Sequence, residues 1–387
     1  MHVKSSRAEL VVVADIGGTN ARFALADPET LELSHIQPTL CADHANLERA
    51  LAEYFSGLPV KPRRAAFAVA APVSVEAIHL TNSHWSFRIS ELCRAAGLEE
   101  IHVLNDFEAL ALSLPALDPA ELHQIGGTVP ETHATKVVLG PGTGLGVAGL
   151  VWSGRDWIAV AGEGGHTSLG AGDAGELAIL RELGQGTSHV SAERAISGPG
   201  LLALYRAVAA HRREPAMGSA DVLARAASGD AVAGEALGMF IAWLGRFAGN
   251  IALAFGARGG VYLGGGIAPR IIAALSAGPF REAFERKGRM RAYLAPIPVY
   301  VIVAEFAALK GAAAALRPKL DMPRSSPRPL RFPTARKICN WRATDPVSNR
   351  AMAKGVYMTQ SPDYLDRIRA NAALHGTVRN YRSLRLA

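Results

Sequence analysis

Cysteine is scarce in this chain, and the few cysteines present lie far apart. Among 387 residues there are only Cys41, Cys93 and Cys339, with no CxxC pair. This spacing excludes a zinc site built from the three cysteines, and it does not resemble the disulfide framework of a secreted protein. We therefore expect a reducing compartment and a cytoplasmic location.

Long hydrophobic runs are also missing. The first apolar run, Leu10–Ala14, is too short for a signal peptide and is typical of a strand. The stretch Pro296–Leu316 is apolar but contains Glu305 and Lys310, so it falls short of a membrane span. We expect no targeting segment and no membrane partner.

Most of the chain lacks an excess of positive charge, although the whole has a net charge of +7. Residues 319–387 hold 14 Lys and Arg against 4 Asp and Glu, so their balance is +10 and that of residues 1–318 is −3. The main body therefore gives no compositional reason to expect nucleic-acid binding.

What the chain does have is length, apolar residues and glycine. It is long enough for two domains, 49% of its residues are hydrophobic, and its 39 glycines lie in short clusters. Short apolar runs between glycine, proline and asparagine predict alternating strands and helices. We expect strands at 10–14, 21–26, 65–71, 101–104, 136–139, 145–152, 260–263 and 299–303, and helices at 46–55, 107–114, 234–255, 306–316 and from Pro269 onward.

A strand–glycine turn–strand unit occurs twice in this pattern. The first has the turn Asp15–Thr19, and the second has the turn Gly140–Gly144. Two such units among mixed strands and helices predict an α/β protein with two domains of related topology that face a cleft.

The two glycine turns are candidate phosphate sites. Glycine lets backbone N–H groups approach phosphate oxygens closely, and a threonine hydroxyl in each turn adds a donor. Neither turn is a P-loop, because no Gly-Lys-Ser/Thr follows, and a strand rather than a helix follows each. A glycine-rich hairpin is also an ordinary structural device, so one turn alone is weak support. A third cluster, Gly264–Gly266, lies between a strand and a helix, where a flat nucleoside could approach.

Seven segments of the chain resemble the bacterial glucokinases outside the ROK group, within the hexokinase-like ATPase superfamily with the actin fold. The segments are VADIGGTNARFAL (13–25), HLTNSHWSF (79–87), VLNDFEALA (103–111), GPGTGLGVA (140–148), GEGGH (162–166), HVSAERAISGPGLLALY (189–205) and VYLGGGIAPRI (261–271). The resemblance covers about residues 10–316, in the family's order. The ROK branch carries a cysteine-rich zinc motif, which this chain lacks.

The resemblance implies a fold, a reaction and a set of residues. The fold would be two actin-like, ribonuclease H-like domains: residues 1–110, completed by a helix at about 304–316, and residues 111–303. The reaction would be ATP-dependent phosphorylation of glucose on its 6-hydroxyl, with Asp106 as the general base. The implied sugar ligands are Asn82, Asn105, Asp106, Glu163, His166 and Glu193. The implied nucleotide-binding residues are Asp15, Gly17, Gly18, Thr19, Asn20, Gly142, Thr143, Gly144, Gly265 and Gly266. Asp15 would also hold Mg²⁺, directly or through water, and a homodimer is implied.

Several of these residues also have ordinary structural interpretations. An aspartate after a strand is often a helix N-cap, so Asp106 on its own would more often be a cap than a base. His166 could be a turn residue, and Glu193 an acid in the first turn of a helix. Glu163, between two glycines, is harder to explain structurally. The family resemblance favours the functional interpretation of all four.

The remaining segment, residues 317–387, begins as a basic, proline-rich linker and shows no helix-turn-helix pattern. We expect a disordered tail, while weak binding of nucleic acid or anionic membrane stays open. Two other functions also stay open: a kinase of another hexose or amino sugar, and a sugar-sensing regulator built on a kinase fold.

Overall fold

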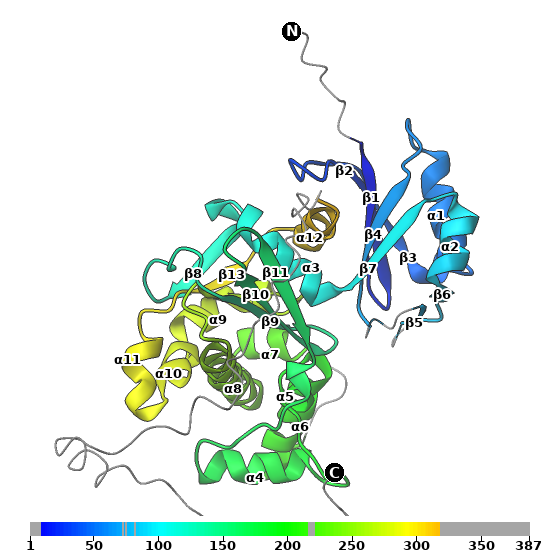
Figure 1. Cartoon of the computed structure of the whole chain (residues 1–387). Coiled ribbons are helices and arrows are strands. Elements are labelled where there is room, and N and C mark those ends of the chain that lie inside the picture. The colour runs from blue at the N-terminus through cyan, green and yellow to red at the C-terminus, as the bar shows by residue number, and fades with distance from the viewer. Residues whose placement is uncertain (1–8, 72, 74–75, 81–82, 216–220, 318–387) are drawn as a thin grey trace, which may run out of the picture. The chain divides into compact units, whose positions relative to one another are not determined.

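The structure, a computed structural model, describes residues 9–71, 73, 76–80, 83–215 and 221–317 (Figure 1). These residues form a mixed α/β protein with two main sheets, as the sequence predicted. The predictions for Asn82 and for residues 318–387 lie outside the described residues.

The first sheet has the strand order β3-β2-β1-β4-β7. Its strands are β1 (Val11–Ile16), β2 (Asn20–Ala26), β3 (Leu33–Leu40), β4 (Arg64–Val69) and β7 (Glu100–Asn105). β1 pairs antiparallel with β2, whereas β1, β4 and β7 are parallel, with Ile16 opposite Val69 and Val69 opposite Asn105. The C-terminal ends of these three strands therefore lie along one edge.

The second sheet repeats this arrangement and adds one strand. Its order is β11-β10-β9-β12-β13-β8, with β8 (Leu122–Gly126), β9 (Lys136–Pro141), β10 (Leu145–Trp152), β11 (Trp157–Gly162), β12 (Val261–Leu263) and β13 (Val299–Ile302). β9, β10 and β11 are antiparallel, and β12 and β13 continue parallel to β9. A separate two-stranded sheet consists of β5 (Ala77–His79) and β6 (Ser86–Arg88).

Helices cover both faces of the first sheet. On one face lie α1 (Leu47–Ser56) and α2 (Ile89–Ala96), in a shared apolar cluster with β1 and β4. On the other face lie α12 (Ala307–Ala315) and part of α3 (Asp106–Ser113). The two helices cross closely, since a Cβ on Gly311 would lie 1.7 Å from the carbonyl oxygen of Ala109. Further along α3, Ala111 packs in a cluster with the second sheet, so α3 contacts both sheets.

The largest apolar cluster lies on one face of the second sheet and is centred on the long helix α8. The helices after β11 are α4 (Ala174–Leu183), α5 (Ala192–Ala195), α6 (Gly198–Arg212), α7 (Val222–Ala227), α8 (Ala231–Phe255), α9 (Ile272–Ala277), α10 (Phe280–Glu285) and α11 (Arg291–Leu294). Short 3-10 helices are η1 (Cys41–Asp43), η2 (Leu114–Ala116), η3 (Pro119–Glu121), η4 (Gly164–His166), η5 (Ala268–Ile271) and η6 (Gly288–Met290). Figure 1 shows α4, α6 and α8 together below the second sheet.

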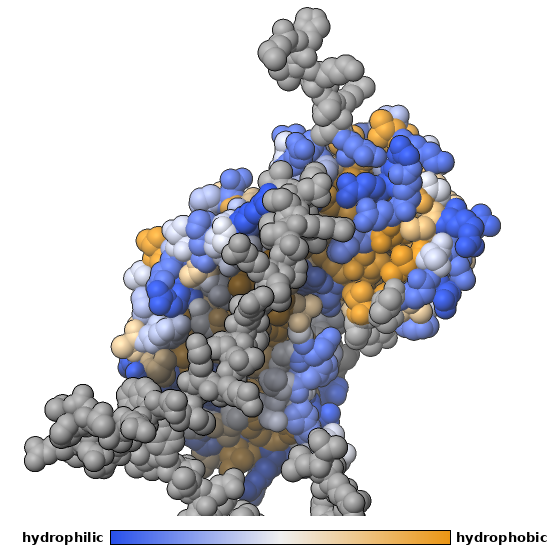
Figure 2. All heavy atoms as spheres, viewed as in Figure 1, coloured by the Kyte–Doolittle hydropathy of each residue, from blue (hydrophilic) through white to orange (hydrophobic). Residues whose placement is uncertain are grey.

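The α8 helix is long and apolar. Among the described residues it is the one helix that, by length and composition, could cross a membrane. Most of its apolar part is buried in the cluster that covers one face of the second sheet, as is usual for a helix in a protein core. On the side shown in Figure 2 the surface is mostly hydrophilic, and apolar side chains gather mainly over the first sheet.

Candidate active site

Asp106 is the first residue of α3, directly after the end of β7. The sequence predicted a helix from Phe107 with Asp106 as its possible cap, and the structure corrects this. Asn105 is the N-cap, and its Oδ1 accepts a hydrogen bond from the Phe107 N–H at 2.9 Å. Asp106 Oδ1 also accepts from Phe107 N–H, at 3.0 Å. Because Asn105 already caps the helix, Asp106 is not needed for that task.

Asp15 lies at the same edge of the first sheet, on β1. The sequence placed it in the glycine turn, but it is a strand residue, with Arg22 of β2 directly opposite. Residues directly opposite on an antiparallel pair point to the same face. Arg22 Nη1 accordingly lies 3.4 Å from Asp15 Oδ2.

Both carboxyl groups have raised pKa values. Burial raises the pKa of Asp15, and the charge of Arg22 lowers it in part. The pKa of Asp106 is raised to about 6, first by burial and then by the negative charge of Asp15, although hydrogen bonds from Phe107 N–H and the Asn105 side chain oppose the rise. A carboxylate with a pKa near neutrality is suited to accept a proton in catalysis.

The first glycine turn joins β1 to β2 and is held by backbone hydrogen bonds. Gly17 N–H donates to the carbonyl oxygen of Asn20 at 2.9 Å, and Cys41 N–H donates to that of Thr19 at 2.9 Å. Thr19 and Asn20 are exposed, and Gly17 and Gly18 are partly exposed. The turn therefore presents backbone and hydroxyl groups near Asp15, and its role as a phosphate site stays a prediction.

The second glycine turn joins β9 to β10 and lies against the loop after β12. A Cβ on Gly140 would lie 2.0 Å from the Gly264 carbonyl oxygen, and one on Gly265, whose φ is +76°, would lie 2.6 Å from that of Pro141. By contrast, no heavy atom lies within 4 Å of a Cβ placed on Gly142 or on Gly266. The protein itself leaves space at these two positions, which suits a bound nucleotide.

Glu193 reaches the second turn from α5. Its Oε2 accepts a hydrogen bond from Leu145 N–H at 2.8 Å, and a Cβ on Gly144 would lie 2.6 Å from the same oxygen. Glu193 does lie in the first turn of a helix, with Ser191 as the N-cap. Its carboxylate nevertheless accepts a hydrogen bond from the backbone of β10. An interaction with the helix dipole alone therefore does not account for the position of Glu193.

His166 and Glu163 lie on and beside the short helix η4, after β11. His166 Nε2 is 3.9 Å from Glu163 Oε2, and both side chains are mostly exposed, at 60% and 66%. A pocket of about 890 Å³ joins His166 to Glu193 and to Thr143 of the second turn. Neither Glu163, Asp106 nor Asp15 is among the described residues that line it. The predicted residues thus form two groups. One lies at the edge of the first sheet. The other includes Thr143, His166 and Glu193 around this pocket, with Glu163 next to His166 but outside the pocket lining.

Arg22 is the residue that the sequence interpretation missed. It is the only charged side chain in β2. The sequence could have indicated it, because pairing the two strands outward from the turn places Arg22 opposite Asp15. The Arg22 guanidinium group places a positive charge next to Asp15, just before the first turn.

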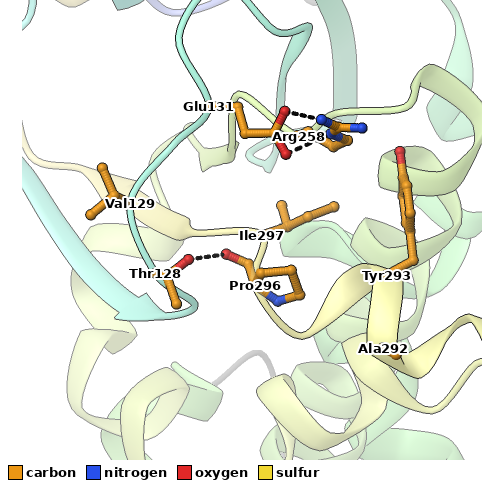
Figure 3. Close-up of a pocket in the computed structure, with 8 residues that line it drawn as sticks. All are labelled: Thr128, Val129, Glu131, Arg258, Ala292, Tyr293, Pro296 and Ile297. Atoms are coloured by element: carbon orange, nitrogen blue, oxygen red, sulfur yellow. Dashed lines mark hydrogen bonds and ion pairs between the residues drawn. The ribbon is translucent and has the colours of Figure 1, made fainter.

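A second pocket, of about 330 Å³, lies away from all the predicted residues (Figure 3). An ion pair between Glu131 and Arg258 crosses one side, and Thr128 Oγ1 donates to the Pro296 carbonyl oxygen at 2.9 Å. Because Arg258 and Thr128 already have partners, we assign no role to this pocket.

Comparison with known proteins identifies the family. The sequence model of the glucokinase family matches residues 12–319. A glucokinase of Chromobacterium violaceum is 46% identical over 328 residues, which cover 84% of this chain and 93% of the relative. A glucokinase of Neisseria meningitidis is 46% identical over 311 residues, covering 79% and 94%. This chain belongs to the glucokinase family.

Solved structures of glucokinases have the same fold. The crystal structure of a glucokinase from an Antarctic psychrotroph has a TM-score of 0.72 and 39% identity, covering 80% of this chain and 98% of that one. A Balamuthia mandrillaris glucokinase in complex with glucose, at 22% identity, has a TM-score of 0.66 over 80% and 94% of the two chains and supports the fold alone.

The described residues offer no ready-made cluster of side chains for a metal. Among these described residues, no group of three or more His, Cys, Asp or Glu could hold an ion. Mg²⁺ often keeps several waters and takes only one or two protein carboxylates together with substrate phosphates. Asp15 beside the first glycine turn fits that pattern of binding.

Proposed function

We propose that this protein transfers the γ-phosphoryl group of ATP to the 6-hydroxyl of D-glucose, with Asp106 as the general base. Membership of the glucokinase family supports the reaction and the substrate. The observation that carries the assignment of the base is the position of Asp106 at the end of β7, with a pKa raised to about 6.

The reaction needs only one proton acceptor. The ionised Asp106 takes the proton of the sugar 6-hydroxyl while that oxygen attacks the γ-phosphorus. The bond between the γ-phosphorus and the bridging oxygen breaks, and its electrons leave with ADP. Phosphoryl transfer depends mainly on positioning and on stabilisation of charge, so a weak base is sufficient.

The nucleotide would lie between the two glycine turns. Gly17, Gly18, Thr19 and Asn20 would bind phosphate from one side, and Gly142, Thr143 and Gly144 from the other, with Gly265 and Gly266 beside adenosine. Mg²⁺, held by Asp15 through water, would neutralise phosphate charge when bound. Arg22 would favour the ionised form of Asp15 against the effect of burial, since its charge lowers the pKa of that carboxyl group.

The sugar would be bound by donors and acceptors in combination. Glu163 and Glu193 accept hydrogen bonds, His166 can do either, and the Asn105 amide can do both. The pocket that contains His166 and Glu193 supports this assignment. Asn82 is kept as a further candidate ligand.

Several finer points remain proposals. The matching strand order of the two sheets supports an actin-like superfamily assignment. The scarcity of cysteine, with no cysteine-rich zinc motif, supports a place outside the ROK branch. The packing of α12 on the first sheet supports a small domain of residues 1–110 with residues 304–316, beside a large domain of residues 111–303. We also propose a homodimer, which light scattering on the purified protein would test, and a cytoplasmic location, where ATP is available.

A substrate panel tests the function most directly. The purified protein, ATP and Mg²⁺ would be assayed for ADP formation with glucose, mannose, fructose, galactose and N-acetylglucosamine. We expect the highest kcat/KM with glucose. A clear preference for another sugar would replace glucose by that sugar, and no turnover with any of them would favour a sugar-sensing regulator.

A further inference from the structure

The two segments that carry the charged sugar residues are joined to each other. Glu163 and His166 precede residues 167–169, and Glu193 follows residues 190–192. Ala192 N–H donates to the Thr167 carbonyl oxygen at 2.8 Å, and Leu169 N–H donates to that of Val190 at 3.0 Å. Displacement of the loop between β11 and α4 would therefore move His166 and Glu193 together.

The far end of this loop is attached to the core helix α8 by an arginine. Arg246 Nη1 donates to the Gly170 carbonyl oxygen at 3.0 Å. Its two terminal nitrogens also pair with both carboxylate oxygens of Glu176, at 2.6 and 2.7 Å. Glu176 Oε2 in turn accepts a hydrogen bond from Gly172 N–H at 2.6 Å. These hydrogen bonds connect the loop to α4, through Glu176, and to α8, through Arg246.

The pair is unusual in its burial. The Arg246 and Glu176 side chains are only 12% and 10% exposed, whereas most ion pairs among the described residues are on the surface. A buried ion pair recovers its desolvation cost only when its remaining donors and acceptors also find partners. Here Gly170 and Gly172 of the loop are two of those partners, so the pair favours one loop position.

Glycine at position 172 allows this close approach. A Cβ there would lie 2.2 Å from Arg246 Nη2. The first half of the loop is held by the backbone hydrogen bonds of Thr167 and Leu169 to residues 190–192, whereas residues 170 and 172 hydrogen-bond to Arg246 and Glu176. The arginine fork is therefore the main attachment of the loop at this end.

We propose that Arg246 and Glu176 are positioning residues for sugar binding, which fix the loop that carries Glu163 and His166. They act through the loop rather than by contact with the sugar. This inference rests on the proposed function, because it assumes that these loop residues bind the sugar. It predicts that loss of the pair weakens sugar binding much more than ATP binding.

The chain offers a matched control. Arg281 also pairs with a partly buried glutamate, Glu285, at 2.6 Å, and also donates to loop carbonyls, those of Ile297 and Ala295. Its loop borders the pocket of Figure 3 and carries none of the sugar residues. Arg281→Met should therefore destabilise the protein in a similar way without affecting the sugar.

The experiment compares Arg246→Met, Arg246→Lys and Arg281→Met with the wild type. Glucose and ATP dissociation constants would be measured by calorimetry, together with melting temperatures and hydrogen exchange of residues 163–173. For Arg246→Met we expect a glucose Kd raised about tenfold, because a small displacement of contact groups is costly, and faster exchange of the loop. Arg246→Lys keeps the charge but not the fork, so its effect should be intermediate.

Two results would overturn the inference: a glucose Kd in Arg246→Met equal to that of the wild type, or equal effects of Arg246→Met and Arg281→Met on glucose. Arg246→Lys keeps the test valid if the methionine variant fails to fold. If the wild type itself does not bind or phosphorylate glucose, the proposed function fails instead, so the two failures are distinguishable.

Discussion

The two sheets share a strand order but differ in how their glycine turns are equipped. In the first hairpin the strands themselves supply a negatively and a positively charged side chain, Asp15 and Arg22, opposite each other. The second hairpin has no acid in its turn, and Glu193 reaches it from a separate helix. The same topology therefore supports two different arrangements of charge.

Burial explains what each arrangement can do. At the edge of the first sheet, burial raises the pKa values of Asp15 and Asp106, and a raised pKa suits a carboxylate that accepts a proton. By contrast, Glu163 and His166 are mostly exposed, so sugar hydroxyls could replace the water around them. We therefore propose proton transfer for the first group and a part in sugar recognition for these exposed residues.

The sharpest test of this comparison is Asp106→Asn. We expect kcat to fall about a thousandfold, the range for loss of a general base, with little change in glucose Kd. Steady-state kinetics and calorimetry would measure both. Glu163→Gln serves as the contrasting variant from the second group, since it should raise KM for glucose more than it lowers kcat. Near-normal kcat in Asp106→Asn would contradict the assigned base.

The same variant should also be more stable at neutral pH. The folded protein holds the pKa of Asp106 at about 6, above its ordinary value of 3.8. Ionisation is therefore costlier in the folded state, and stability is lost as pH rises through that interval. Asparagine removes this cost, so we expect a gain on the order of 1 kcal/mol in denaturant unfolding at pH 7 and none at pH 3.

The pH dependence of activity gives the next largest effect. Because the base must be ionised, kcat should fall about tenfold per pH unit below the Asp106 pKa and level off above it. The acid limb should lie near pH 6, and a profile that is flat between pH 5 and 8 would argue against a raised pKa of the base. Circular dichroism at each pH would exclude unfolding as the cause.

Substitutions of two glycines in the second turn should distinguish an effect on nucleotide binding from an effect on stability. Gly142→Ala places its methyl group in open space, so we expect an unchanged melting temperature but a KM for ATP raised about tenfold. Gly140→Ala places its methyl group against the Gly264 carbonyl, so it should lower stability by about 2 kcal/mol or more. Unchanged ATP kinetics in Gly142→Ala would remove this turn from the nucleotide site.

The smallest expected effect concerns Arg22. Without its charge the pKa of Asp15 should rise further, since Arg22 now lowers it. We expect Arg22→Met to need about fivefold more Mg²⁺ for half-maximal activity, because a higher pKa of Asp15 makes its charged, metal-binding form costlier. Arg22→Lys, which keeps the charge, should be close to the wild type. An identical Mg²⁺ requirement in all three proteins would break the link between Arg22 and Asp15.

Much of the framework could be predicted from local pattern. The prediction of the hairpins over residues 10–26 and 136–152 is confirmed, because apolar runs separated by glycine leave the chain few alternatives. The helix predicted over residues 46–55 is observed one residue later, with Asn46 as its cap. The prediction failed between residues 153 and 233, where β11 and the helices α4 to α7 had been left unassigned. Cap signals were present there, at Asp173 and Ser197.

By itself, the sequence determined the family and the two hairpin units, since these follow from residue order and local spacing, and it proposed the candidate residues. Only the tertiary structure decided how those residues are used. The sequence could not show that Arg22 lies beside Asp15, or that the Glu193 carboxylate accepts a hydrogen bond from Leu145 N–H. Nor could it show that Arg246 binds Gly170 in the loop between β11 and α4. Each of these contacts depends on the pairing and packing of distant segments, and the same packing sets the burial that raises the pKa of Asp106.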